Sequence, residues 1–109
     1  MVEGLVLVCK TSDVPSNSVK FYVVEGKNLA LFNVDGTFYA TDDECTHGAA
    51  SLSEGILDGD IVECNLHFGA FHIPTGKPVA APCSIPLRTY KTQVVGEDVL
   101  VNLNQAAAS

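Results

Sequence analysis

The chain has 109 residues, of which 47% are hydrophobic and 17% are charged, and its formal net charge is −7 at pH 7. That length suits a single domain, residues 1–109, and leaves no room for a second catalytic module. Only six lysines and arginines are present against 13 acidic residues, which argues against nucleic acid as a partner, because phosphate binding needs clustered cations. A partner with a basic docking face is expected instead.

Short runs rich in Val, Phe, Tyr and Leu alternate with Gly, Asp and Asn along the chain, and helical periodicity is nearly absent. This pattern predicts an all-β protein with antiparallel strands. The strands are expected over residues 5–10, 19–25, 28–34, 37–42, 61–63, 70–73, 89–95 and 99–103. Tight turns are expected at Gly26-Lys27, Asp35-Gly36, Asp58-Gly59 and Gly96-Glu97-Asp98.

Residues 76–86 contain three prolines and cannot form a central strand, because proline has no N–H for the ladder. A stiff loop is expected there. No run approaches the roughly 18 apolar residues of a membrane helix, and the apolar run 5–9 is too short for a signal peptide. We therefore expect a soluble, cytoplasmic protein with no membrane partner.

Two clusters of metal-ligand residues follow the strands expected at 37–42 and 61–63. Cys45 and His47 form the first, and Cys64 and His67 form the second. A [2Fe–2S] cluster with two cysteines on one iron and two histidines on the other uses this donor set. Zinc is the alternative metal, but zinc sites usually take their ligands in homogeneous pairs, whereas each loop here supplies one cysteine and one histidine.

The residues 45–52 (CTHGAASL), 64–71 (CNLHFGAF) and 75–78 (TGKP) resemble the Rieske ferredoxin family, most closely the small ferredoxins of bacterial aromatic-ring-hydroxylating dioxygenase systems. The resemblance implies an antiparallel β-sandwich with a cluster-binding subdomain over about residues 43–86. It also implies one Rieske-type [2Fe–2S] cluster per chain, held by Cys45, His47, Cys64 and His67. In the family the two histidines face the docking partner.

The respiratory branch of the family has an extra disulfide between the cluster loops, where this chain has Ala50 and Leu66. That branch also has hydroxyl donors to sulfur, where this chain has Gly69 and Phe71. Fewer hydrogen bonds to sulfur stabilise the reduced cluster less. A potential at the low end of the Rieske range of roughly −150 to +300 mV is therefore expected.

The resemblance implies an electron carrier between a flavin-dependent, NADH-oxidising reductase and the terminal oxygenase of an aromatic-ring dioxygenase, and a monomer is expected. The chain is not expected to be an enzyme, since the non-heme iron of an oxygenase would need two further histidines and only His72 remains. Two alternatives stay open. One is a small Rieske subunit of a nitrite or arsenite oxidoreductase, and the other is a zinc-stabilised interaction module.

Outside the motif, His72 is expected to be a partly exposed strand residue, and Cys9 and Cys83 to be small buried hydrophobic residues. The acidic residues at 42–44 are interpreted as a solvated face. Together with the acidic residues between the two cysteine loops, they would steer a basic partner.

Overall fold

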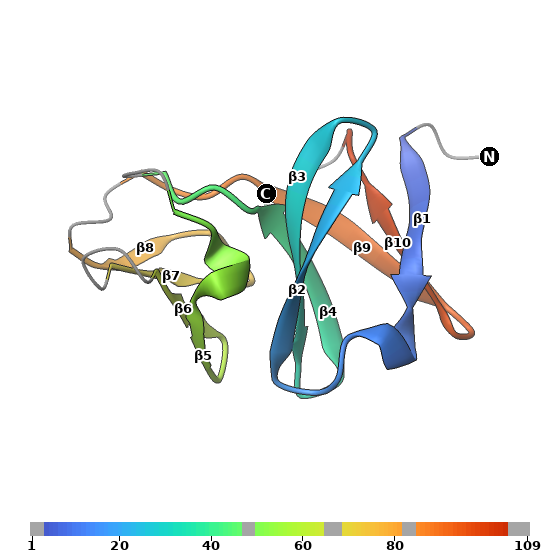
Figure 1. Ribbon diagram of the computed structural model, residues 1–109, viewed down its shortest axis with the longest axis horizontal. Helices are drawn as coiled ribbons and strands as arrows, with labels where there is room; N and C mark the ends of the chain where they lie inside the picture. The colour runs from blue at the N-terminus through green and yellow to red at the C-terminus, as the bar shows by residue number, and fades with distance from the viewer. Residues whose placement is uncertain (1–3, 47–49, 65–68, 82–84, 105–109) are drawn as a thin grey trace.

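Figure 1 shows the computed structural model of the protein, in which residues 4–46, 50–64, 69–81 and 85–104 are described. The regular elements are ten strands and two single-turn 3₁₀ helices in this part of the chain. In chain order they are β1 (Leu5–Lys10), η1 (Thr11–Asp13), β2 (Ser18–Val24), β3 (Lys27–Val34), β4 (Thr37–Asp42), η2 (Leu52–Glu54), β5 (Ile56–Asp58), β6 (Ile61–Glu63), β7 (Ala70–His72), β8 (Pro78–Ala80), β9 (Thr89–Val95) and β10 (Asp98–Asn102).

The larger sheet has six antiparallel strands in the order β1-β10-β9-β4-β3-β2. Its two edge strands, β1 and β2, also contact each other, so the sheet curls into a half-barrel. The smaller sheet has four antiparallel strands in the order β5-β6-β7-β8. The predicted antiparallel all-β sandwich is confirmed, with two sheets of unequal size.

Three hairpins of the larger sheet close through two-residue turns, including the β9–β10 turn at Gly96-Glu97, within the predicted range. Asp35 and Gly36 join β3 to β4, as predicted, and both have positive φ (53° and 93°). Such turns match the natural twist of antiparallel strands. The turn predicted at Gly26-Lys27 is wrong by one residue, because Lys27 already pairs with Val24 as part of β3.

The smaller sheet contains two strands that the sequence did not predict, β5 and β8. Each has three residues and none of them is buried, so the pattern of a core-facing strand is missing. β8 begins at Pro78, inside the range expected to be a loop, and it lies at the edge of the sheet, where the missing N–H of proline does not interrupt a ladder. The turn before β6 is at Gly59-Asp60, one residue later than predicted, because Asp58 pairs with Ile61.

β3 separates two cores, because it is buried on both faces. Leu29 and Leu31 pack into the core of the half-barrel, and Ala30 and Phe32 pack into a second core beneath the smaller sheet. Figure 1 shows the smaller sheet and η2 on one side of β2 and β3, with β1, β9 and β10 on the other. No helix in the described ranges is long and apolar enough to span a membrane.

Gly76 fastens the β7–β8 turn to the segment that enters β9. The carbonyl of Gly76 accepts the N–H of Leu87 at 2.8 Å. Its φ is +76°, and a Cβ at this position would overlap the carbonyl oxygen of Leu87. Glycine is therefore the residue that allows both the turn and the close approach.

Candidate metal centre

Cys45 lies at the base of a short hairpin that follows β4. Its N–H donates to the carbonyl of Ala50 (2.8 Å), and the N–H of Leu52 donates to the carbonyl of Asp43 (2.7 Å). Glu44 forms a β-bridge with the residue opposite, Ser51. Segments 43–45 and 50–52 therefore run antiparallel and hold the ends of the first cysteine loop together.

Cys64 follows β6 in an equivalent way. Its N–H donates to the carbonyl of Gly69 at 2.6 Å, so each cysteine closes its loop by a hydrogen bond to the residue five positions later. The histidine of each pair lies between these two positions in the sequence, but His47 and His67 themselves lie outside the described residues. The loops are thus matched in size and closure, as two loops that hold one metal centre would be.

The two cysteines share one core. Cys45 is 2% exposed and Cys64 is fully buried, and both belong to the core beneath the smaller sheet. The structure therefore brings the two predicted sulfur ligands into one apolar environment. Their neighbours in this core are Ala30, Phe32, Leu52, Val62, Phe71, Ile73 and Leu87.

A third segment, residues 85–88, borders the first cysteine loop. The hydroxyl of Thr46, between Cys45 and His47, donates to the carbonyl of Ile85 at 2.7 Å. Leu87, two residues later, is buried in the core that contains the cysteines. The end of the proline-containing segment is thereby held beside the first cysteine loop, whereas Cys83 lies outside the described part of the chain.

The prediction that residues 42–44 form a solvated acidic face is wrong for Asp43 and holds only in part for Asp42, which is half-buried. Asp43 is 3% exposed, and Asp42 accepts a hydrogen bond of 2.5 Å from the hydroxyl of Tyr90. Burial, and then this bond, raise the pKa of Tyr90 to about 12. Only Glu44 is exposed.

Asp43 and Glu44 differ because the alternation of inward and outward side chains in β4 continues beyond the end of the strand. Thr41, Asp43 and Cys45 are all buried at a spacing of two. Extending the period from Thr41 to Cys45 would have placed the Asp43 side chain on the inner face.

His72 is partly exposed on β7, as predicted, but it has two side-chain partners that the sequence did not reveal. Its Nδ1 lies 2.8 Å from the hydroxyl oxygen of Thr75, and its Nε2 lies 3.0 Å from Oδ2 of Asp60. The ring therefore joins the β5–β6 turn to the β7–β8 turn. This contact stabilises the smaller sheet and involves neither cysteine.

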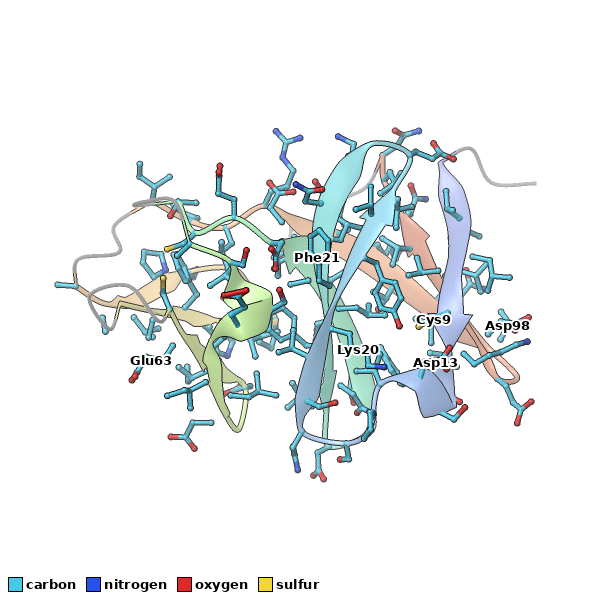
Figure 2. The ribbon with its side chains drawn as sticks, in the orientation of Figure 1. Cys9, Asp13, Lys20, Phe21, Glu63 and Asp98 are labelled. Carbon is cyan, nitrogen blue, oxygen red and sulfur yellow. The ribbon has the colours of Figure 1, made fainter. Side chains whose placement is uncertain are left out.

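Cys9 is buried in the half-barrel, which confirms the prediction for this residue. Figure 2 shows Cys9 on β1, in the half of the molecule away from the smaller sheet. Burial raises the pKa of its thiol, and a hydrogen bond with Tyr22 opposes that effect. Its position separates it from the two loop cysteines.

Comparison with known proteins identifies the family of the chain. Residues 4–91 match the family model of the Rieske [2Fe-2S] domain. The chain belongs to the Rieske family. It is 47% identical over 100 residues to the biphenyl dioxygenase ferredoxin subunit of Pseudomonas sp. (strain KKS102), covering 91% of this chain and 92% of that protein.

Other relatives agree with this assignment. The ferredoxin component of the naphthalene 1,2-dioxygenase system of Pseudomonas aeruginosa is 44% identical over 92 residues, covering 84% of this chain and 88% of that protein. A chain in the solved complex of reduced oxygenase and oxidized ferredoxin in carbazole 1,9a-dioxygenase superposes with a TM-score of 0.85 at 40% identity, covering 99% of this chain and 97% of that chain. This protein is accordingly a Rieske ferredoxin, an electron-transfer component and not itself a catalyst.

The described residues fit the [2Fe–2S] cluster that this family carries. Two buried sulfur donors come from the bases of two loops closed in the same way, and thiolates are suitable ligands for iron–sulfur clusters. The surrounding side chains are apolar, which limits access of water to the sulfur atoms and lowers the local dielectric constant.

Proposed function

We propose that Cys45, His47, Cys64 and His67 hold one Rieske [2Fe–2S] cluster per chain, with the two cysteines on one iron and the two histidines on the other. Support comes from the burial of both cysteines in one core and from the matched hydrogen bonds that close their loops. When bound, such a cluster accepts and releases one electron. The described residues would exclude water from the sulfur side of the cluster.

The cluster-binding subdomain that we propose spans about residues 43–86. It would contain the first cysteine hairpin, the smaller sheet and the proline-containing segment. Within the described residues, two backbone hydrogen bonds join it to the neighbouring segments: Asp43 N–H to Asn28 O (3.0 Å) and Leu87 N–H to Gly76 O (2.8 Å).

The electron would come from a flavin-dependent, NADH-oxidising reductase and go to the terminal oxygenase of an aromatic-ring dioxygenase. The relatives named above are ferredoxins of such systems, and the carbazole structure contains an oxygenase together with its ferredoxin. We place the protein in the cytoplasm, where NADH is oxidised, and expect it to act as a monomeric shuttle between the two partners.

A low reduction potential would suit this role. Phe71 is fully buried in the core that contains both cysteines, and it has no hydroxyl to donate toward sulfur. Gly69, which closes the second loop, has no side chain to donate either. The reduced, more negative cluster would therefore receive little stabilisation from these positions.

Reconstitution tests the proposed partners. The protein is mixed anaerobically with NADH and the reductase of the biphenyl, naphthalene or carbazole system, and then with the oxygenase of the same system. Bleaching of the cluster by at least one reductase, followed by reoxidation with its oxygenase, is expected. A cluster that dithionite reduces but that exchanges electrons with none of these components would contradict the proposal, and a colourless protein with bound zinc would support the interaction module instead.

A further inference from the structure

Asp43 is a buried carboxylate two residues before the first cysteine of the site. All three of its polar groups form hydrogen bonds, one to β3 and two to η2. Its N–H donates to the carbonyl of Asn28 in β3, its carbonyl accepts the N–H of Leu52 in η2, and its Oδ1 accepts the N–H of Ser53 at 2.9 Å. One residue thus connects the half-barrel, the end of β4 and the 3₁₀ helix.

These bonds fix the base of the hairpin that carries Cys45. Ser51, the N-cap residue of η2, makes no side-chain cap bond, so the Asp43 carboxylate supplies an acceptor that the helix start needs. Without that acceptor, the N–H of Ser53 would have to find water at a half-buried position. Asp43 therefore holds both strands of the hairpin, segments 43–45 and 50–52, through its side chain and its backbone.

Asp43 forms no ion pair within the described residues, and its side chain is removed from solvent screening. An anion in such an environment acts over a longer range than one in water. It disfavours a further negative charge in its neighbourhood.

We propose that Asp43 is a positioning residue for the first cysteine loop, and that its charge lowers the reduction potential of the cluster. The inference rests on the proposed ligand set. The hydrogen bonds keep Cys45 in the core, and the buried carboxylate makes the reduced cluster, which carries one more negative charge, less favourable.

Asp43→Asn separates the electrostatic role from the positioning role, because it keeps an acceptor for the N–H of Ser53 and removes the charge. Its midpoint potential, measured by film voltammetry, is expected to shift to more positive values. Glu44→Gln is the matched control, because Glu44 is one residue nearer to Cys45 but exposed. Its shift should be smaller and should fade in about 1 M salt, where the Debye length is about 3 Å, whereas the shift of Asp43→Asn should persist.

Positioning is tested by Asp43→Ala, which also removes the acceptor. Loss of iron to a chelator, followed by absorbance, is expected to be several-fold faster than in the wild type, and Asp43→Asn should restore the slow rate. If Asp43→Ala does not fold, Asp43→Ser, with a shorter acceptor, takes its place.

A midpoint for Asp43→Asn equal to that of the wild type, or to that of Glu44→Gln, would overturn the electrostatic role. Unchanged iron retention in Asp43→Ala would overturn the positioning role. Wild-type protein without iron and acid-labile sulfide would instead overturn the proposed function, so the two failures are distinguishable.

Discussion

At the scale of single residues, the three histidines of the chain provide an internally controlled test of the ligand set. His47→Ala and His67→Ala should each abolish the Rieske absorption and EPR spectra, because each removes a nitrogen ligand. His72→Ala should keep both spectra and lower the free energy of unfolding by about 0.5–1.5 kcal/mol, through loss of its contacts with Thr75 and Asp60. Loss of the cluster in His72→Ala, with retention in either of the others, would refute the assignment.

The Tyr90 hydroxyl gives a prediction about stability and pH. Tyr90→Phe should lower the free energy of unfolding by about 1.5–3 kcal/mol at pH 7, because it removes a hydrogen bond to the Asp42 carboxylate. The folded-state pKa of about 12 exceeds the ordinary value of 10.0, so this stabilisation is complete below pH about 10 and is lost as the pH rises toward 12.

Urea unfolding of both proteins across this pH range measures the effect. The difference between wild type and Tyr90→Phe should shrink above pH 10. A difference that stays constant to pH about 12 would mean that the hydroxyl titrates alike in the folded and unfolded chains. Tyr22, whose pKa is also raised to about 12, is present in both proteins and therefore cancels in the comparison.

The sequence could predict some site residues and not others, for a physical reason. Cys45 and Cys64 stand out in the sequence because thiols close to histidines at these spacings have a specific chemistry, and the structure adds that both are buried in one core. The acidic run was misread because two carboxylates side by side suggest solvation. Continuing the period of two from Thr41 to Cys45 places Asp43 inward, whereas the hydrogen bond between Asp42 and Tyr90 joins residues far apart in the sequence and could not be read from it.

At the scale of elements, the close approach of the β7–β8 turn to Leu87 makes Gly76 hard to replace. Gly76→Ala adds a Cβ that overlaps a backbone carbonyl and also requires an unfavourable φ. The conformational term alone is about 1–2 kcal/mol, and the overlap should raise the loss of unfolding free energy above it. Gly26→Ala is the control, since φ is +82° there and nothing lies within 4 Å.

Chemical unfolding of Gly76→Ala and Gly26→Ala separates the conformational cost from the cost of the overlap with the carbonyl. Gly26→Ala should lose only the conformational part, whereas Gly76→Ala should lose clearly more and should release its iron faster. Equal losses of unfolding free energy in the two variants would show that the segment entering β9 shifts without an energetic penalty. The β7–β8 turn would then not hold that segment in place.

The predicted strands are those that include buried apolar residues. β1, β4, β6 and β9 have the predicted bounds, and β3 starts one residue earlier than predicted. β6 and β7 are as short as β5 and β8 but include buried residues, whereas β5 and β8, which were not predicted, include none. Their pairing depends on β6 and β7, to which they attach as the edges of the smaller sheet.

At the scale of the whole molecule, negative charge is concentrated in the proposed cluster-binding subdomain. Residues 43–86 contain six carboxylates and one lysine, so −5 of the net charge of −7 lies there. Asp43 is buried, which leaves Glu44, Glu54 and Asp58 among the exposed members. This uneven distribution of charge would orient the proposed cluster-binding subdomain toward a basic partner before contact.

Neutralising these three exposed carboxylates together, as Glu44→Gln, Glu54→Gln and Asp58→Asn, should slow reduction by the reductase roughly tenfold at low ionic strength. It should also flatten the dependence of the rate on salt. The control removes as much charge from exposed sites elsewhere, with Glu25→Gln, Asp35→Asn and Glu97→Gln. Stopped-flow rates that fall equally in both triple variants would show that only net charge matters.

Pulsed EPR of the dithionite-reduced protein probes the proposed metal centre itself. We expect a rhombic spin-half signal from a mixed-valence iron pair, with couplings to the nitrogens of two imidazoles that bind one of the irons. A protein without that signal, or one whose reduced iron pair shows no imidazole nitrogen coupling, would not have the proposed ligand set.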